Sequence, residues 1–320
     1  MDRKKMKRNI DSLNINNLFG RILKIKSSGN CKNEILALYG HHSSLERMYS
    51  IADVLSDYGD VIMPDLPGLG GMDSFYKLGL KPNFDSYADY LAAFIKMRYK
   101  RKKVLLVGFS FSVPIIIKTL QKYPELINRV EYVVSFVGFS HKDDFIFSKR
   151  FTKTATMLSS LGSLKLAACF LKNVVYRPFL IKTVYRLASS KHPKFRSLSN
   201  EDKNKSTNFE VELWQKNDLR TWFYTTKQML QVDLCGEKVR NLEIYHVNTS
   251  DDAYLNPHNV TQHLNVIFDK VINFESDMIN HMPTIVSSKN EASRFLPDDI
   301  KAVLQKNLIN KKNKGAKIKK

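Results

Sequence analysis

Long apolar runs are missing from this chain. None approaches the roughly 20 residues that a membrane-spanning helix needs, and the longest, residues 104–117, is interrupted by serines and a proline. The basic residues 1–8 are followed by neither an apolar stretch nor a small-residue cleavage site, so we expect no secretory signal peptide. We therefore expect a cytoplasmic protein.

Cysteine is scarce, with 3 residues in 320. Cys31, Cys169 and Cys235 have no metal-ligand spacing, and their odd number argues against a disulfide framework. We expect reduced thiols, no bound metal and no other cofactor, which also fits the cytosol. Internal repeats are absent as well, which argues against solenoids and propellers.

Acidic residues are too few to balance the basic ones: 31 Asp and Glu face 51 Lys and Arg, which gives a net charge of +20. Part of this charge lies in two predicted basic tails, residues 1–17 and 311–320, and we expect the first to be unstructured or a short helix. Another part runs through the middle of the chain, at Lys142, Lys149, Arg150, Lys153, Lys165, Lys172, Arg177, Lys182 and Arg186. Because Lys, Asn and Ile are all abundant, we favour a compositional bias as its cause. No recognition motif accompanies the charge, so we expect no specific nucleic-acid partner.

The segment 165–186 leaves an alternative open. It combines basic residues with leucines and aromatics, as a helix lying weakly on an anionic membrane surface would. The favoured interpretation is a covering helix with a solvated basic face. The oligomeric state is not predicted.

The most informative stretch is residues 104–117. An apolar run ends at Gly108, Ser110 stands in the turn, and a second apolar run follows from Val113. This indicates a buried strand, a sharp turn and a helix, the arrangement of a nucleophile elbow with the pattern Gly-x-Ser-x-Gly. Small residues on both sides of Ser110 let strand and helix approach closely, and Ser112 replaces the last glycine.

Around this stretch, apolar runs with strand and helix periodicity alternate. We expect strands at 21–26, 35–39, 61–63, 104–107, 130–137, 242–247 and 271–274, and helices at 45–58, 85–97, 112–123, 255–268 and 297–308. This alternation predicts an α/β fold: a mostly parallel central sheet with helices on both faces. We expect the strand at 21–26 to lie at the edge of the sheet.

The middle of the chain lacks strand-like runs. Residues 157–187 and 219–234 have helical periodicity, and strand-type sequence resumes only at residue 242. We therefore predict a helical cap, residues 141–236, inserted into a core made of residues 18–140 and 237–310.

Four motifs make the chain resemble the α/β-hydrolase fold of the cap-bearing type, over residues 35–308. The elbow at 108–112 is the first, and Tyr39-Gly40-His41-His42 is similar to the family's His-Gly oxyanion turn, with tyrosine in place of the first histidine. Residues 64–70, Pro-Asp-Leu-Pro-Gly-Leu-Gly, look like its Asp-x-Pro-Gly-x-Gly loop, which we interpret as a structural turn rather than a phosphate cradle. The fourth is an acid after one late strand and a histidine after the next.

The resemblance implies a catalytic triad in the order Ser, acid, His. Ser110 would be the nucleophile and His281 the base, because His281 follows the last predicted strand. We read His258 and His263 as surface residues and His246 as structural. The predicted acid is Asp252, and the alternatives are Asp251, one residue earlier, and the pair Asp143 and Asp144 after the strand that precedes the cap.

The resemblance also implies an oxyanion hole made of the backbone N–H groups of His41 and Phe111. His42 would line the substrate pocket. The implied activity is a serine hydrolase that cleaves a small-molecule ester or related acyl bond through an acyl-enzyme. The alternatives are a carbon–carbon bond hydrolase with the same triad, or a non-catalytic protein of this fold that binds a ligand or partner.

Overall fold

The structure, a computed structural model, describes residues 3–28, 33–189, 200–249, 252–276 and 289–305. Its centre is an eight-stranded sheet in the order β1-β2-β4-β3-β5-β6-β7-β8. The strands are β1 (Ile10–Ile15), β2 (Leu18–Ile25), β3 (Glu34–Leu38), β4 (Asp60–Pro64), β5 (Val104–Phe109), β6 (Val130–Phe136), β7 (Val239–Thr249) and β8 (Phe268–Ser276). From β4 to β8 all neighbours are parallel, whereas β1 and β2 pair antiparallel. The predicted α/β class is confirmed.

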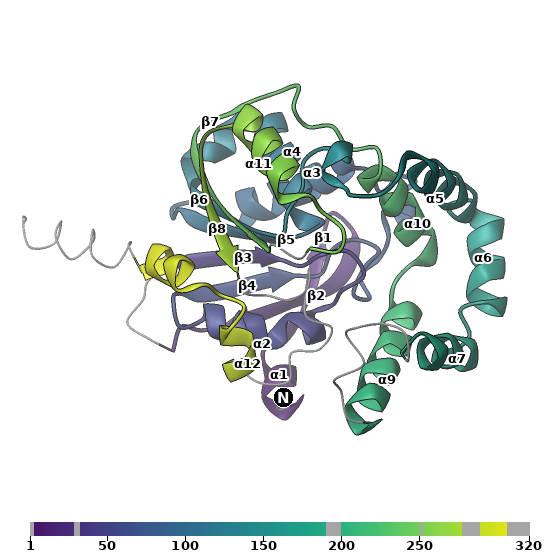
Figure 1. Ribbon diagram of the computed structural model, residues 1–320. Helices are drawn as coiled ribbons and strands as arrows, with labels where there is room; N and C mark the ends of the chain where they lie inside the picture. The colour runs from purple at the N-terminus through teal and green to yellow at the C-terminus, as the bar shows by residue number, and fades with distance from the viewer. Residues whose placement is uncertain (1–2, 29–32, 190–199, 250–251, 277–288, 306–320) are drawn as a thin grey trace, which may run out of the picture.

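Helices cover both faces of this sheet (Figure 1). They are α2 (Leu45–Leu55) and α12 (Lys289–Ser293) on one face, and α3 (Phe84–Arg98), α4 (Ser112–Lys122) and α11 (Pro257–Ile267) on the other. A short helix α1 (Arg3–Arg8) precedes the sheet, and residues 298–305 are helical. Every residue of β5 is buried, because a central parallel strand is covered on both sides, and this explains its unbroken apolar sequence.

The predicted N-terminal tail, residues 1–17, is wrong over residues 10–15, which form the edge strand β1. A hairpin joins β1 to β2, and its two turn residues, Asn16 and Asn17, have φ values of +50° and +64°. Asparagine tolerates this left-handed backbone better than most residues, and two such residues in succession suit a tight hairpin turn. Consequently β2 lies second in the sheet and is not the predicted edge strand. The predicted tail at 311–320 lies outside the described residues.

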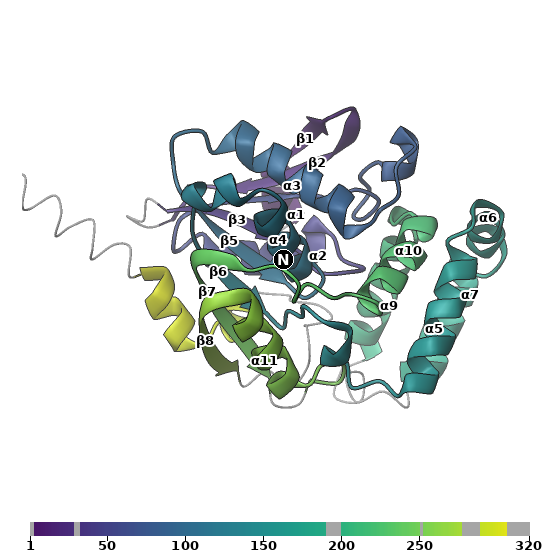
Figure 2. The same ribbon diagram turned by 90° about the horizontal axis from the view of Figure 1, so that it is seen from above.

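In the residues that the structure describes between β6 and β7 there are five α-helices, and we call them the insertion helices. They are α5 (Lys149–Gly162), α6 (Lys165–Val174), α7 (Pro178–Ser189), α9 (Asn200–Lys216) and α10 (Leu219–Met229). The predicted helical character of this segment is confirmed, although the run 157–187 is divided among three helices. Figures 1 and 2 show all five beside the sheet, with α9 and α10 nearer to it than α5 to α7. Where a cap begins and ends stays a prediction.

In the described part of the chain, no single helix is both long and apolar enough to cross a membrane. The helices α5 and α6 reach the necessary length and composition only together, and the chain bends by 93° between them.

Candidate active site

The sequence-predicted nucleophile lies where the strand order reverses. From β3 the chain continues to β4 on one side of the sheet, and β5 lies on the other side of β3. In open parallel sheets, ligands bind at the carboxyl ends of the strands at such a point. Gly40 and His41 follow β3, and Ser110 follows β5, so this edge carries both predicted motifs.

Ser110 adopts the backbone expected of an elbow. Its φ is +50°, in the left-handed region that non-glycine residues rarely occupy. Two hydrogen bonds hold it there: its N–H donates to the carbonyl of Phe136 at 2.9 Å, and its own carbonyl accepts from Val113 N–H at 3.0 Å. Strained backbone of this kind persists only where the surroundings fix it, and it gathers at functional sites.

Gly108 and Ser112, the small residues on either side of Ser110, serve different structural purposes. A Cβ on Gly108 would lie 2.8 Å from Ile116 Cδ1, so glycine permits the close contact of β5 with α4. Ser112, which stands where the family pattern has glycine, is fully buried. Its Oγ accepts from Phe109 N–H at 2.8 Å and donates to the carbonyl of Leu38 at 2.7 Å. The serine at this position therefore ties the ends of β3 and β5 together.

The segments that carry the predicted oxyanion donors flank the serine. A Cβ on Gly40 would lie 3.4 Å from Ser110 Cβ and 3.2 Å from the carbonyl oxygen of Phe109, so this turn passes close to the elbow. Phe111 is the N-cap of α4. The first N–H groups of a helix lack intrahelical acceptors and favour negative charge. Backbone amides from both segments thus lie near Ser110.

The side chain of His41 serves as an anchor. Its Nε2 lies 2.8 Å from Thr225 Oγ1 of α10, and its ring centroid is 5.3 Å from Phe111 and 5.4 Å from Trp222. Burial lowers the pKa of His41 to about 3, so the ring is neutral near pH 7. The imidazole thereby attaches the turn after β3 to an insertion helix.

His42 meets the insertion helices too. Its ring centroid lies 4.1 Å from that of Trp214, and its Nδ1 is 3.0 Å from Asn217 Nδ2. Its Nε2 lies 3.4 Å from Glu210 Oε2, and burial lowers its pKa while Glu210 opposes that shift. These contacts fill the joint between turn and insertion, and a role in lining a substrate pocket stays a prediction.

Glu210 of α9 is a site residue that the sequence did not single out. It is only 5% exposed, pairs with Arg47 of α2, and accepts from the Tyr185 hydroxyl at 3.2 Å. Burial raises its pKa, but His42 and Arg47 outweigh this and hold the pKa of Glu210 below its usual value. A buried carboxylate thus joins the insertion helices to α2 beside the turn after β3.

Asp252 lies just beyond the carboxyl end of β7. Its Oδ1 accepts from the N–H groups of Tyr254 at 2.8 Å and Leu255 at 3.1 Å. Its charge also acts on His246, whose ring is buried inside the sheet with Nδ1 2.9 Å from Ser135 Oγ. The structural interpretation of His246 is confirmed. His281, the predicted base, and Asp251, the alternative acid, lie outside the described residues.

The other alternative acid, Asp144, is engaged elsewhere. One carboxylate oxygen lies 2.5 Å from His263 Nδ1, and the other accepts from the N–H groups of Ser140 at 2.7 Å and His141 at 2.9 Å. The prediction that His263 is a surface residue is therefore wrong. Its side chain is half-buried, because it ties α11 to the loop after β6. His258 is exposed, as predicted.

Asp143, which was predicted together with Asp144 as an alternative acid, has a side chain that is 70% exposed.

Tyr39 has a role that the sequence did not reveal. Its buried hydroxyl accepts from Leu66 N–H at 2.8 Å and donates to Asp65 Oδ1 at 3.1 Å. Arg21 Nε donates to the other oxygen of Asp65 at 2.9 Å, although burial raises the pKa of Asp65 to about 7. Tyr39 therefore fixes the loop after β4.

The loop after β4 contacts the start of α10. Gly68 has a φ of +81°, and its carbonyl accepts a hydrogen bond from Asp218 N–H at 2.9 Å. The interpretation of residues 64–70 as a structural turn is confirmed.

Within the described part of the chain, no three His, Cys, Asp or Glu side chains gather in a way that could hold a metal ion. Cys169 and Cys235 are free thiols there, and Cys31 lies outside the described residues.

No protein-family model and no curated protein matches the sequence. Many solved structures match the fold. An epoxide hydrolase, CorEH, is 13% identical with a TM-score of 0.64, covering 92% of this chain and 97% of that one. A thermophilic esterase from Thermogutta terrifontis is 11% identical with a TM-score of 0.58, covering 94% and 97%. A membrane phospholipase A, described as a bacterial virulence factor, is 13% identical with a TM-score of 0.61, covering 93% and 86%. Likeness at such low identity shows the fold.

Proposed function

The chain has the α/β-hydrolase fold, and on that premise we propose that it is a serine hydrolase that cleaves an ester or related acyl bond. The observation that carries this proposal is Ser110, with a φ of +50° at the carboxyl edge of the sheet where the strand order reverses. A serine is held in a strained backbone here, at the site where the fold binds ligands.

In the proposed reaction, His281 accepts the proton of Ser110 Oγ as the oxygen attacks the carbonyl carbon of the substrate. The oxyanion of the tetrahedral intermediate accepts hydrogen bonds from the backbone N–H groups of His41 and Phe111, which stabilise the charge. His281 then gives the proton to the leaving group, and an acyl-enzyme remains. Water, deprotonated by His281, releases the acid in the same way.

We assign the acid of the triad to Asp252. Its place after β7 is the one that the fold uses for this residue, and its carboxylate would orient His281 and stabilise the imidazolium. Asp144 is disfavoured because both of its carboxylate oxygens are already occupied, by His263 and by two backbone N–H groups. Asp143 is disfavoured by its exposure.

We further propose that the insertion helices act as the cap that selects the substrate. Two tryptophans, Trp214 and Trp222, lie against the rings of His41 and His42 at the joint. Aromatic side chains together with the basic insertion would suit an apolar acyl chain with an anionic end. An ester series that varies chain length and terminal charge tests this, and a preference confined to short neutral esters would contradict it.

Labelling with a fluorophosphonate probe tests the nucleophile directly. The native protein should label, and Ser110→Ala and His281→Ala should not, while Ser86→Ala, a serine in the first turn of α3, should label like the native protein. A folded native protein that does not label would refute the proposal and favour the non-catalytic ligand-binding alternative. A labelled protein that cleaves no ester would point to carbon–carbon bond hydrolysis with the same triad.

A further inference from the structure

The helices α5, α6 and α7 expose most of the large apolar side chains that are exposed in this protein. In the described part of the chain, twenty such side chains are exposed, and thirteen of them lie in residues 151–187. They are Phe151, Met157, Leu158, Leu161, Leu164, Leu166, Phe170, Val174, Val175, Phe179, Leu180, Val184 and Leu187, and we call them the apolar face. Large exposed apolar patches mark surfaces that bind a partner or a membrane.

The polarity of α5 is opposite to that of a helix packed in a soluble protein. The side that it turns inward carries small residues, such as Ser159 and Gly162, which are buried. A Cβ on Gly162 would lie 2.5 Å from the Phe223 ring of α10, so this side touches its neighbour. On the opposite side of the helix, Met157 and Leu161 are 57% and 53% exposed. A helix that faced only water on that side would carry polar residues there.

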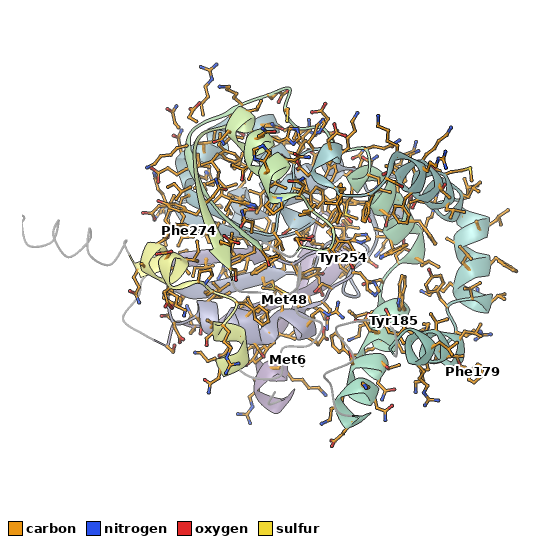
Figure 3. The ribbon with its side chains drawn as sticks, viewed as in Figure 1. Met6, Met48, Phe179, Tyr185, Tyr254 and Phe274 are labelled. Atoms are coloured by element: carbon orange, nitrogen blue, oxygen red, sulfur yellow. The ribbon has the colours of Figure 1, made fainter. Side chains whose placement is uncertain are left out.

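The next two helices extend the same surface. Leu166 and Phe170 of α6 are 85% and 62% exposed, and Phe179 of α7 is 75% exposed. Figures 1 and 2 agree that α5, α6 and α7 form the border of the molecule farthest from the sheet. In Figure 3, Phe179 lies at the outer end of α7, on the side away from the sheet. The apolar face thus lies on the outer part of the insertion.

The charge of the same segment limits what can cover this face. Residues 145–189 contain eight Lys and Arg and not one Asp or Glu, whereas the whole chain has 31 acidic residues to 51 basic ones. A partner that covers the apolar face must therefore tolerate or neutralise a concentrated positive charge. A second copy does not meet this condition, because a symmetric contact would bring the eight basic side chains of each copy together.

We propose that α5, α6 and α7 dock on the surface of an anionic lipid bilayer. The apolar face enters the boundary between headgroups and acyl chains, and the lysines and arginines around it meet the anionic headgroups. Because the chain bends by 93° between α5 and α6, both helices can lie in the plane of the surface rather than cross it. The proposal does not depend on Ser110 or on any catalytic activity.

Co-sedimentation of the full chain with vesicles tests this. The probes are phosphatidylcholine vesicles with and without phosphatidylserine, each at low and high salt. We expect binding to the anionic vesicles alone and binding about tenfold weaker or more at high salt, because salt screens the headgroup charge. Ser110→Ala should bind like the native protein, which separates docking from the proposed hydrolase activity.

Two matched pairs of variants separate the apolar and the charged contributions. Leu166→Gln with Phe179→Gln should weaken binding at least tenfold, whereas Met97→Gln with Val266→Gln, two exposed apolar residues of α3 and α11, should leave it unchanged. Lys165→Gln with Lys172→Gln should weaken binding more than Lys100→Gln with Lys103→Gln, which removes the same charge from exposed lysines before β5. All eight substitutions fall on exposed side chains, so the variants should fold.

Three results would overturn the proposal. The first is no sedimentation of the native protein with anionic vesicles. The second is equal binding by the two members of either matched pair. The third is a dimer in sedimentation velocity that Leu166→Gln with Phe179→Gln dissociates, because the apolar face would then be covered by a second copy.

Discussion

The helices α4 and α5 have similar lengths and opposite packing. In α4, Val113 and Ile115 to Ile117 are fully buried between β5 and the neighbouring helix. In α5 the large apolar side chains point outward and the buried side is made of small residues. The packing of α4 holds the backbone of Ser110 in place. The packing of α5 leaves an apolar surface that a membrane or a partner can cover.

Polar contacts join the insertion helices to the part of the protein built around the sheet. Glu210, Arg47 and His42 form one connection, and the hydrogen bond between His41 and Thr225 forms another. A buried polar connection is strong only while each of its members keeps its partner. We therefore expect the packed sheet to contribute most of the free energy of unfolding. We expect the attachment of the insertion helices to be sensitive to the loss of a single buried polar side chain.

The largest effect should come from Glu210→Ala, which leaves Arg47 and His42 buried beside an empty position. Breaking one side of a buried ion pair costs about 3–5 kcal/mol, which urea denaturation can measure. The control is Glu212→Ala on the same helix, whose half-exposed carboxylate pairs with Lys216 and should contribute less than about 1 kcal/mol. Equal losses in the two variants would contradict the idea that Glu210 joins the regions.

A second pair of variants compares a buried leucine of the sheet with an exposed leucine of the insertion helices. Leu106→Ala in β5, where the side chain is fully buried, should lower the free energy of unfolding by about 2–5 kcal/mol. Leu166→Ala in α6, where it is 85% exposed, should change it by no more than about 0.5 kcal/mol. Thermal or urea unfolding measures both. A comparable loss for Leu166→Ala in dilute protein would mean that its side chain is buried in solution.

The sequence was sufficient for the elbow because its signals are local. The apolar run of β5, the small residues around Ser110 and the periodicity of α4 all lie within 20 residues of one another. By contrast, β1 is not predicted, although Asn16 and Asn17 carry a hairpin signal, because the basic residues 3–8 before it are typical of a solvated tail. Its short run of alternating residues also resembles an irregular segment.

Contacts between distant parts of the chain could not be predicted in this way. Glu210 and Arg47 are 163 positions apart, and α9 is rich in charges, so nothing in the sequence marks this glutamate as the buried one. The bond between His263 and Asp144 spans 119 positions and misled the prediction for the same reason. The assignments of His281 and Asp252 in the triad rest on the order of the strands and stay predictions.

The buried hydroxyl of Ser112 at the start of α4 can be tested against another buried serine. Ser112→Ala removes a buried hydroxyl that joins Phe109 N–H and the Leu38 carbonyl, and it should cost about 1–3 kcal/mol. Ser43 is a buried serine whose hydroxyl has no hydrogen-bond partner in the part of the chain that the structure describes, so Ser43→Ala should be nearly neutral. Urea unfolding of the two variants measures the difference. A neutral Ser112→Ala would mean that the serine merely fills the place of glycine.

The smallest expected effect is a pH dependence of the free energy of unfolding that arises from His246 in β7. Burial lowers the pKa of His246 from 6.5 to about 4, and the charge of Asp252 only partly offsets this. Below pH 6.5 the unfolded chain binds a proton there that the folded protein does not, so stability falls as the pH falls from about 6.5 to about 4.

His246→Asn, which can keep a hydrogen bond to Ser135, removes this contribution. The stability of the native protein should therefore fall more than that of the variant between pH 7 and 5.5, by about 1 kcal/mol, in urea unfolding at the two pH values. Below pH 4 the two curves should run parallel, because the folded His246 is then protonated as well. Parallel curves throughout would mean that the pKa of this imidazole is the same in the folded and the unfolded protein, and that the sheet is more open to water there than its packing implies.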